Sequence, residues 1–148
     1  MNEQTVEETF WKMCEEATNF EAKNFDSANA DVRLVEPYLL RILNFVKENP
    51  QYEELFKQCF IQMGTGKKRY VDLILLYCMR ELQYPEVQKA VNEHFRNLGG
   101  PSKAPRLMNY VSDVNIVYEK APWEDAIFFQ YHWEREYPEE PWPGSNDS

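Results

Sequence analysis

The sequence contains no long apolar segment. Its longest apolar run, Leu73 to Met79, is far shorter than the roughly 20 residues that cross a bilayer. The first residues, MNEQTVEETFWK, have neither a cationic start nor the apolar stretch of a signal peptide. We therefore expect a cytoplasmic protein that makes no membrane contact.

Residues that build disulfides and metal sites are also scarce. The three cysteines, Cys14, Cys59 and Cys78, cannot all pair, and each falls within an apolar helical segment, which predicts buried, reduced thiols. His94 and His132 are the only histidines, and the H-E-x-x-H, C-x-x-C and E-x-x-H patterns do not occur. We therefore expect neither a metal nor a cofactor.

The segment IQMGTGKKRY is the nearest approach to a nucleotide-binding motif. A phosphate-binding loop needs a glycine where Ile61 stands and a hydroxyl residue where Lys68 stands. The segment instead predicts the end of a helix at Gly64, followed by a solvated basic turn. In that turn Lys67, Lys68 and Arg69 form a possible anion-binding site that would also suit an acidic partner.

No arrangement of residues predicts catalysis. A nucleophile needs a neighbouring base, whereas the cysteines are predicted to be buried and the few serines lie in predicted loops or the C-terminal segment. Neighbouring acids such as Glu7 and Glu8 point in different directions from a helix and are typical of a solvated surface. We predict that the chain is not an enzyme, and an enzyme with an unrecognised site remains an alternative.

The composition is that of a folded domain, with 148 residues, 43% of them hydrophobic and 28% charged. Apolar residues recur with the helical period along most of the chain. We predict one all-α domain over residues 1–137 and a flexible, acidic, proline-rich tail over residues 138–148. About seven helices are expected, near residues 6–20, 37–48, 52–63, 70–82, 87–98, 107–118 and 123–136.

Particular residues support these boundaries. Thr5 and Glu8 fit a capping box that opens the first helix, and residues 21–31 have the composition of a loop. The third helix has the clearest core stripe, and the segment near residue 75 is long enough to favour a helix over a strand. The inward-facing residues of the fifth helix are predicted to be Val87, Val91, Phe95 and Leu98.

A weak repeat underlies these helices. Pro50, Pro85 and Pro122 are about 36 residues apart, and each stands between an apolar helix and an amphipathic one. This pattern resembles the helix–turn–helix units of HEAT repeats. The resemblance implies three stacked αα-hairpins, over residues 37–63, 70–98 and 106–136, with residues 6–20 as an N-terminal capping helix.

The net charge of −9 is unevenly distributed. Residues 67–106 hold eight basic and four acidic side chains, whereas residues 107–148 hold two basic and nine acidic ones. The basic segment suggests nucleic-acid binding as an alternative function, through Lys67, Lys68, Arg69, Arg80, Lys89, Arg96, Lys103 and Arg106. The overall acidity makes nucleic acid an unlikely partner.

The last third of the chain mixes aromatic and acidic residues, a combination that is typical of protein interfaces. We therefore predict a protein-binding module, with an inhibitor or an immunity or antitoxin-type protein as the narrower hypothesis, and a basic protein as its partner. The oligomeric state is not predicted. The predicted contact residues are Glu124, Asp125, Trp133, Glu134, Glu136, Tyr137, Glu139 and Glu140.

Overall fold

The computed structural model describes residues 2–24, 34–119 and 138–139, and within these ranges every regular element is a helix. The all-α prediction is confirmed for this part of the chain. Seven α-helices occur there, as many as expected, although the predicted seventh helix lies outside the described residues and a short helix in the predicted linker takes its place. The helices are α1 (Glu3–Asn24), α2 (Glu36–Lys47), α3 (Glu53–Gly64), α4 (Asp72–Leu82), α5 (Pro85–Asn97), α6 (Gly100–Lys103) and α7 (Met108–Val117), with 3₁₀ turns η2 (Pro50–Tyr52) and η3 (Pro105–Leu107).

Helix α1 begins earlier and ends later than predicted. Asn2 caps it, because the Asn2 side-chain oxygen accepts a hydrogen bond of 2.8 Å from the Thr5 amide. The predicted capping box at Thr5 and Glu8 is therefore wrong, and Thr5 is the third helical residue. The helix also continues through residues 21–24, where a loop was expected.

The core is built mainly from α1, α2, α3 and α4. The predicted stripe on α3 is confirmed, with Phe56, Cys59 and Phe60 fully buried. Phe10 on α1 lies against both phenylalanines, with ring centroids 5.6 Å from Phe56 and 5.3 Å from Phe60. The three thiols are buried and free, as predicted, and burial raises the pKa of Cys59 to about 12.

Helix α4 confirms the choice of helix over strand for the most apolar segment. The amide of Val71, just before α4, donates a hydrogen bond of 3.0 Å to the Thr18 hydroxyl of α1. At the other end of α4, Gln83 adopts a left-handed conformation, and its side-chain amide donates to the Val117 carbonyl of α7 at 2.8 Å. Helix α4 is thereby tied to α1 at one end and to α7 at the other.

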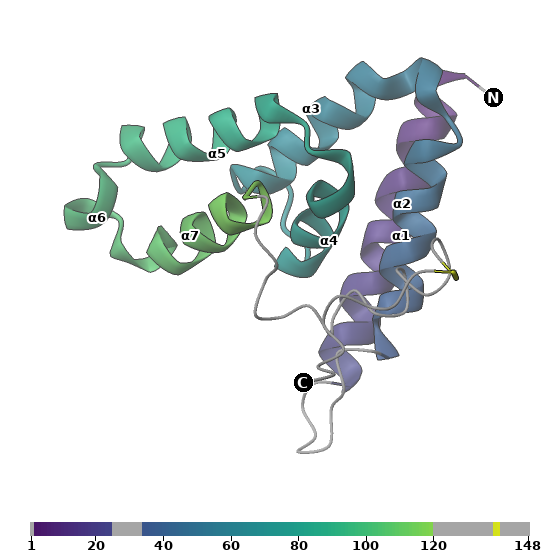
Figure 1. Ribbon diagram of the computed structural model, residues 1–148, viewed down its shortest axis with the longest axis horizontal. Coiled ribbons are helices and arrows are strands. Elements are labelled where there is room, and N and C mark those ends of the chain that lie inside the picture. Colours follow the sequence, from purple (N-terminus) through teal and green to yellow (C-terminus); the bar gives the residue numbers. More distant parts are fainter. Residues whose placement is uncertain (1, 25–33, 120–137, 140–148) are drawn as a thin grey trace.

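Helices α5 and α7 form an arm that α6 closes at its tip (Figure 1). Asn92 and Asn115 join the two helices through reciprocal side-chain hydrogen bonds of 2.8 and 3.0 Å. The Tyr118 hydroxyl donates to the Tyr84 carbonyl at 2.7 Å. Leu98 was predicted to face inward, but it lies just beyond the end of α5 and is 47% exposed, so that prediction is wrong.

The helices pack in a regular order. Helix α2 packs against α4 and α4 against α7, while α3 packs against α5 and α1 contacts both α2 and α3. Equivalent helices of successive predicted hairpins are therefore neighbours, which is compatible with side-by-side stacking. Figure 1 shows α1 and α2 side by side at the side of the molecule away from the α5–α7 arm. The likeness to HEAT repeats stays a prediction.

Candidate functional site

The turn between α3 and α4 is held by backbone hydrogen bonds that close the end of α3. The Gly66 amide donates to the Met63 carbonyl at 3.3 Å, and the amides of Lys67 and Lys68 both donate to the Gln62 carbonyl, at 2.9 and 3.1 Å. Gly66 has a φ of 82°, which is the left-handed geometry of a glycine beyond a helix end. Helix α3 ends at Gly64, as predicted, but the left-handed residue that closes the helix end is Gly66.

Gly64 is the last residue of α3 and has a packing role instead. A Cβ atom at this position would lie 2.6 Å from the Cγ2 atom of Val91 on α5 and 3.6 Å from the hydroxyl oxygen of Tyr110 on α7. Glycine thus allows the end of α3 to approach α5 closely. It also leaves one wall of a neighbouring cavity without a side chain.

A cavity of about 340 Å³ lies between this turn, α5, and the η3–α7 segment. The turn brings Lys68 and Arg69 to the cavity, α4 brings Asp72, α5 brings His94, and η3 brings Arg106. The whole lining consists of Met63, Gly64, Thr65, Gly66, Lys68, Arg69, Tyr70, Asp72, Val91, His94, Phe95, Arg106, Leu107, Tyr110 and Val111. This volume is within the range of small-ligand sites.

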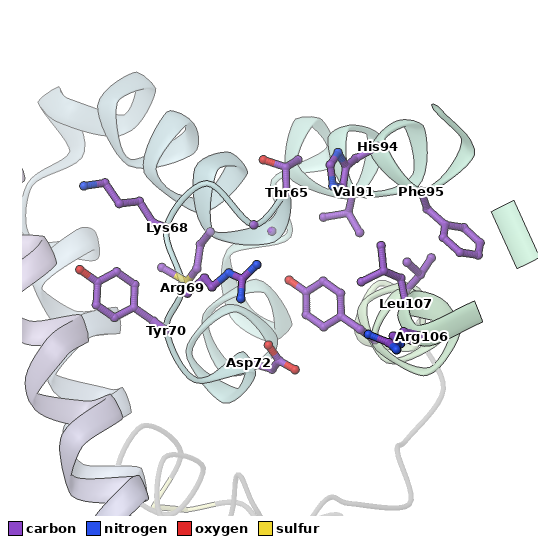
Figure 2. A pocket seen from close by; sticks show the side chains of 15 residues that line it. Thr65, Lys68, Arg69, Tyr70, Asp72, Val91, His94, Phe95, Arg106 and Leu107 are labelled. Carbon is purple, nitrogen blue, oxygen red and sulfur yellow. The ribbon is translucent and has the colours of Figure 1, made fainter. Parts of the chain in front are cut away.

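Two arginines and a histidine of the lining have no partner in the described part of the chain. The side chains of Arg69, Arg106 and His94 form no hydrogen bond or ion pair with any described residue. Figure 2 shows Arg69 reaching into the cavity, with His94 on the α5 side of it. Donors left free around one cavity suit an anion, because an arginine side chain can donate two parallel hydrogen bonds to a carboxylate or a phosphate.

Lys68 lines the cavity but its ammonium group turns away from it, toward α1 (Figure 2). The Nζ atom lies 5.4 Å from the centre of the Trp11 ring, and Trp11 in turn stacks on Tyr70 at 5.6 Å. The Lys68 charge therefore contributes to the field around the cavity rather than to direct contact. Lys67 is exposed and does not line the cavity.

Asp72 and Tyr110 complete the polar part of the lining. Desolvation, with a further contribution from Asp113, raises the pKa of Asp72. Burial, with a further contribution from Asp72, raises the pKa of Tyr110, so its hydroxyl stays protonated at neutral pH. Because that hydroxyl has no hydrogen-bond partner among the described residues, Tyr110 is a fourth free donor.

The rest of the lining is apolar. Val91 and Val111 are buried, whereas Phe95, Leu107 and Tyr110 are half-buried. The rings of Phe95 and Tyr110 contact no other aromatic ring of the described residues, in contrast to the linked rings around Phe10. The cavity therefore combines a cationic rim with apolar and aromatic walls.

Of the predicted anion-binding residues, Arg69 reaches into the cavity. Lys68 lines the cavity, but its ammonium group contributes only an electrostatic field there. His94 and Tyr110 were not predicted to take part, and Arg106 was named only for the alternative of nucleic-acid binding. One signal in the sequence could have pointed to them, since no acidic residue occurs from His94 to Ser112, a segment that includes Arg96, Lys103 and Arg106.

The predicted acidic and aromatic surface is not part of this site. Of its eight residues only Glu139 belongs to the described part of the chain, where it is exposed. The other seven, Glu124, Asp125, Trp133, Glu134, Glu136, Tyr137 and Glu140, lie outside the described residues, so that surface stays a prediction.

The residues suggested for nucleic-acid binding are distributed over several elements. Lys89 and Arg96 are exposed on α5, and a helix of about 3.6 residues per turn places them on the side opposite Val91 and the cavity. Arg80 is half-buried on α4. Nucleic-acid binding through these basic residues stays a prediction.

No family model, no curated protein and no solved structure matches the chain. Among the described residues, no group of three or more His, Cys, Asp or Glu side chains could hold a metal ion. None of the helices in the described ranges is both long enough and apolar enough to cross a membrane.

Proposed function

We propose that this protein is a binding module that recognises an anionic group on its partner through the cavity between the α3–α4 turn, α5 and α7. The observation that supports the proposal is the set of unpartnered donor side chains, Arg69, Arg106 and His94, around one cavity. Arg69 and Arg106 are exposed, so an incoming anion can reach both guanidinium groups. The lining offers only Asp72 as an acid.

The geometry suits binding because the donors come from separate rigid elements. Arg69 follows a turn that four backbone hydrogen bonds hold in place, since the amides of Thr65 through Lys68 all donate to α3 carbonyls. His94 belongs to α5 and Arg106 to η3. Asn92 and Asn115 join α5 to α7 through reciprocal hydrogen bonds. Such preorganisation lowers the entropic cost of binding.

A pair of matched variants tests the proposal. Arg69→Gln/Arg106→Gln removes two positive charges from the cavity, and Lys89→Gln/Arg96→Gln removes the same charge from the opposite face of α5. We expect calorimetric titration with small oxyanions to show binding by the unmodified protein and by the second variant. We expect the first variant to lose about 100-fold in affinity, because each charge-assisted hydrogen bond contributes about 1.5–3 kcal/mol.

Equal losses in both variants would show that binding depends only on overall charge. Wild-type affinity in the first variant would mean that the cavity is not the site. Circular dichroism of both variants checks that each is folded, and both pairs are exposed, so little change in stability is expected.

A second candidate function is the binding of a basic protein through an acidic surface, as an inhibitor or immunity-type protein would bind. The outer face of α1 favours it, because Glu8, Glu15 and Glu16 are all exposed there. An acidic face of this kind accelerates association with a cationic partner. Charge reversal at these three positions should then slow association with a captured basic partner and weaken its salt dependence, whereas the cavity variant should leave the rate unchanged.

A further inference from the structure

We infer that the anionic group recognised by this cavity is an aryl phosphate, a phosphate monoester carried on an aromatic ring. This inference rests on the proposed function and specifies the ligand of the same cavity. The lining combines separate cationic donors with two aromatic rings, and each half of an aryl phosphate matches one of these features.

The charge of the lining favours a dianion. Lys68, Arg69 and Arg106 bring three positive charges and Asp72 brings one negative charge, which leaves a formal charge of +2 before His94 is counted. A phosphate monoester carries a charge of about −1.5 to −2 at neutral pH and offers three acceptor oxygens, whereas a carboxylate carries one charge and two oxygens. The side chains of Arg69 and Arg106, with the Tyr110 hydroxyl, supply more donors than a single carboxylate can accept.

The apolar walls favour an aromatic carrier. Phe95 from α5, Leu107 from η3 and Tyr110 from α7 all line the cavity. Neither ring is stacked on another ring of the described residues, so both remain free to contact a guest ring. Gly64 also lines the cavity, but the space beside it is filled by Val91.

The backbone of the α3–α4 turn does not take part in holding the phosphate. Its amides from Thr65 to Lys68 are already bonded to carbonyls of α3, and the Thr65 hydroxyl donates to the Ile61 carbonyl at 2.7 Å. Recognition therefore depends on side chains. An oxyanion without an apolar part would contact the donor side chains of the cavity but not its apolar walls.

Isothermal titration of the full chain with five probes tests this inference. The probes are phenyl phosphate, inorganic phosphate, benzoate, a phosphotyrosine peptide and the matched phosphoserine peptide. Phenyl phosphate should bind about tenfold more tightly than inorganic phosphate, because its ring leaves water for an apolar wall. Benzoate should bind more weakly than phenyl phosphate, and the phosphotyrosine peptide should bind more tightly than the phosphoserine peptide.

Two conservative variants separate the halves of the cavity. Phe95→Leu keeps an apolar side chain in place but removes the ring, so it should reduce the ratio of phenyl phosphate affinity to inorganic phosphate affinity. Arg69→Gln/Arg106→Gln should weaken both phosphates by about 100-fold. Lys89→Gln/Arg96→Gln should change neither.

The outcomes distinguish the inference from the proposed function. Equal affinity for phenyl and inorganic phosphate, or for the two peptides, with loss in the Arg69/Arg106 variant, would overturn the aryl inference and leave anion binding intact. Tighter binding of benzoate would also overturn it. Absence of binding by all five probes would overturn both. If the phosphotyrosine peptide exceeds phenyl phosphate in affinity, the aryl phosphate comes from a partner protein, and equal affinity identifies a free small molecule.

Discussion

Replacing Gly64 with alanine should destabilise the protein, although alanine is normally the better helix former. The added Cβ atom would lie 2.6 Å from Val91 Cγ2, about 1 Å inside ordinary van der Waals contact. Val91 is almost fully buried and β-branched, so its rotamer cannot change easily within α5. Overpacking of this kind costs about 1–3 kcal/mol, against a gain of about 0.5–1 kcal/mol from removing a helical glycine. We expect a net loss of about 1–2 kcal/mol in the free energy of unfolding.

A double-mutant cycle with Val91→Ala isolates the clash. Val91→Ala alone should cost roughly 2 kcal/mol, because it removes two buried methyl groups. In the double variant the Cβ of residue 64 occupies space that Val91 has left, so the combined loss should be smaller than the sum of the single losses by about 1 kcal/mol or more. Urea denaturation followed by circular dichroism supplies all four free energies.

Gly66→Ala is the matched control for this cycle. It is the same chemical change two residues away, but the position has a φ of 82° and nothing lies within 4 Å of the added Cβ atom. Its cost, about 1 kcal/mol, should come from the backbone alone and should add to that of Val91→Ala without coupling. A neutral or stabilising Gly64→Ala, or additive losses with Val91→Ala, would refute the assignment of Gly64 as a close-packing residue.

Three further predictions concern the core. Phe56→Ala should cost about 3–5 kcal/mol by chemical denaturation, since Phe56 is fully buried between Phe10 and Phe45, and a loss below about 1 kcal/mol would contradict this packing. Tyr77→Phe should cost about 1–3 kcal/mol, because the Tyr77 hydroxyl donates to the buried Glu36 carboxylate at 3.0 Å, and an unchanged denaturation midpoint would argue against that bond. Burial raises the pKa of Cys59 from 9.0 to about 12, so the thiol loses its proton at a lower pH in the unfolded chain than in the folded protein. The free energy of unfolding should therefore be unaffected by this thiol below pH 9 and should fall as the pH rises toward 12. An equal alkaline loss of stability in Cys59→Ala would exclude this thiol as the cause.

Helix existence was predictable because each helix has a local cause. The 3.6-residue period of apolar side chains fixed which face of α3 is buried, and proline at an early position marked the starts of α2 and α5. The ends were harder to predict, because a cap depends on which residue first leaves the helical conformation. Asn2 precedes Thr5 by three residues and takes the capping position that Thr5 was predicted to hold.

Of the candidate site, only the basic turn was predictable. Lys68 and Arg69 are neighbours in sequence, so a local pattern reveals them, whereas His94, Arg106 and Tyr110 reach the cavity through the packing of α3 on α5 and of α5 on α7. No periodicity within one helix carries that information. The packing role of Gly64 was not predictable for the same reason, because its need for a small side chain comes from Val91 on another helix.

The Gly-Thr-Gly sequence illustrates why a motif must be interpreted through its hydrogen bonds. In a phosphate-binding loop, glycines leave the amides free to face the ligand. Here the amides of Gly66, Lys67 and Lys68 point back to the carbonyls of α3, so the glycine that permits the turn also removes the backbone donors. These hydrogen bonds also turn the chain, so that the next residue, Arg69, extends over the cavity. The turn can therefore serve anion recognition only by positioning a side chain, and affinity should depend on the guanidinium group of Arg69 rather than on the glycines.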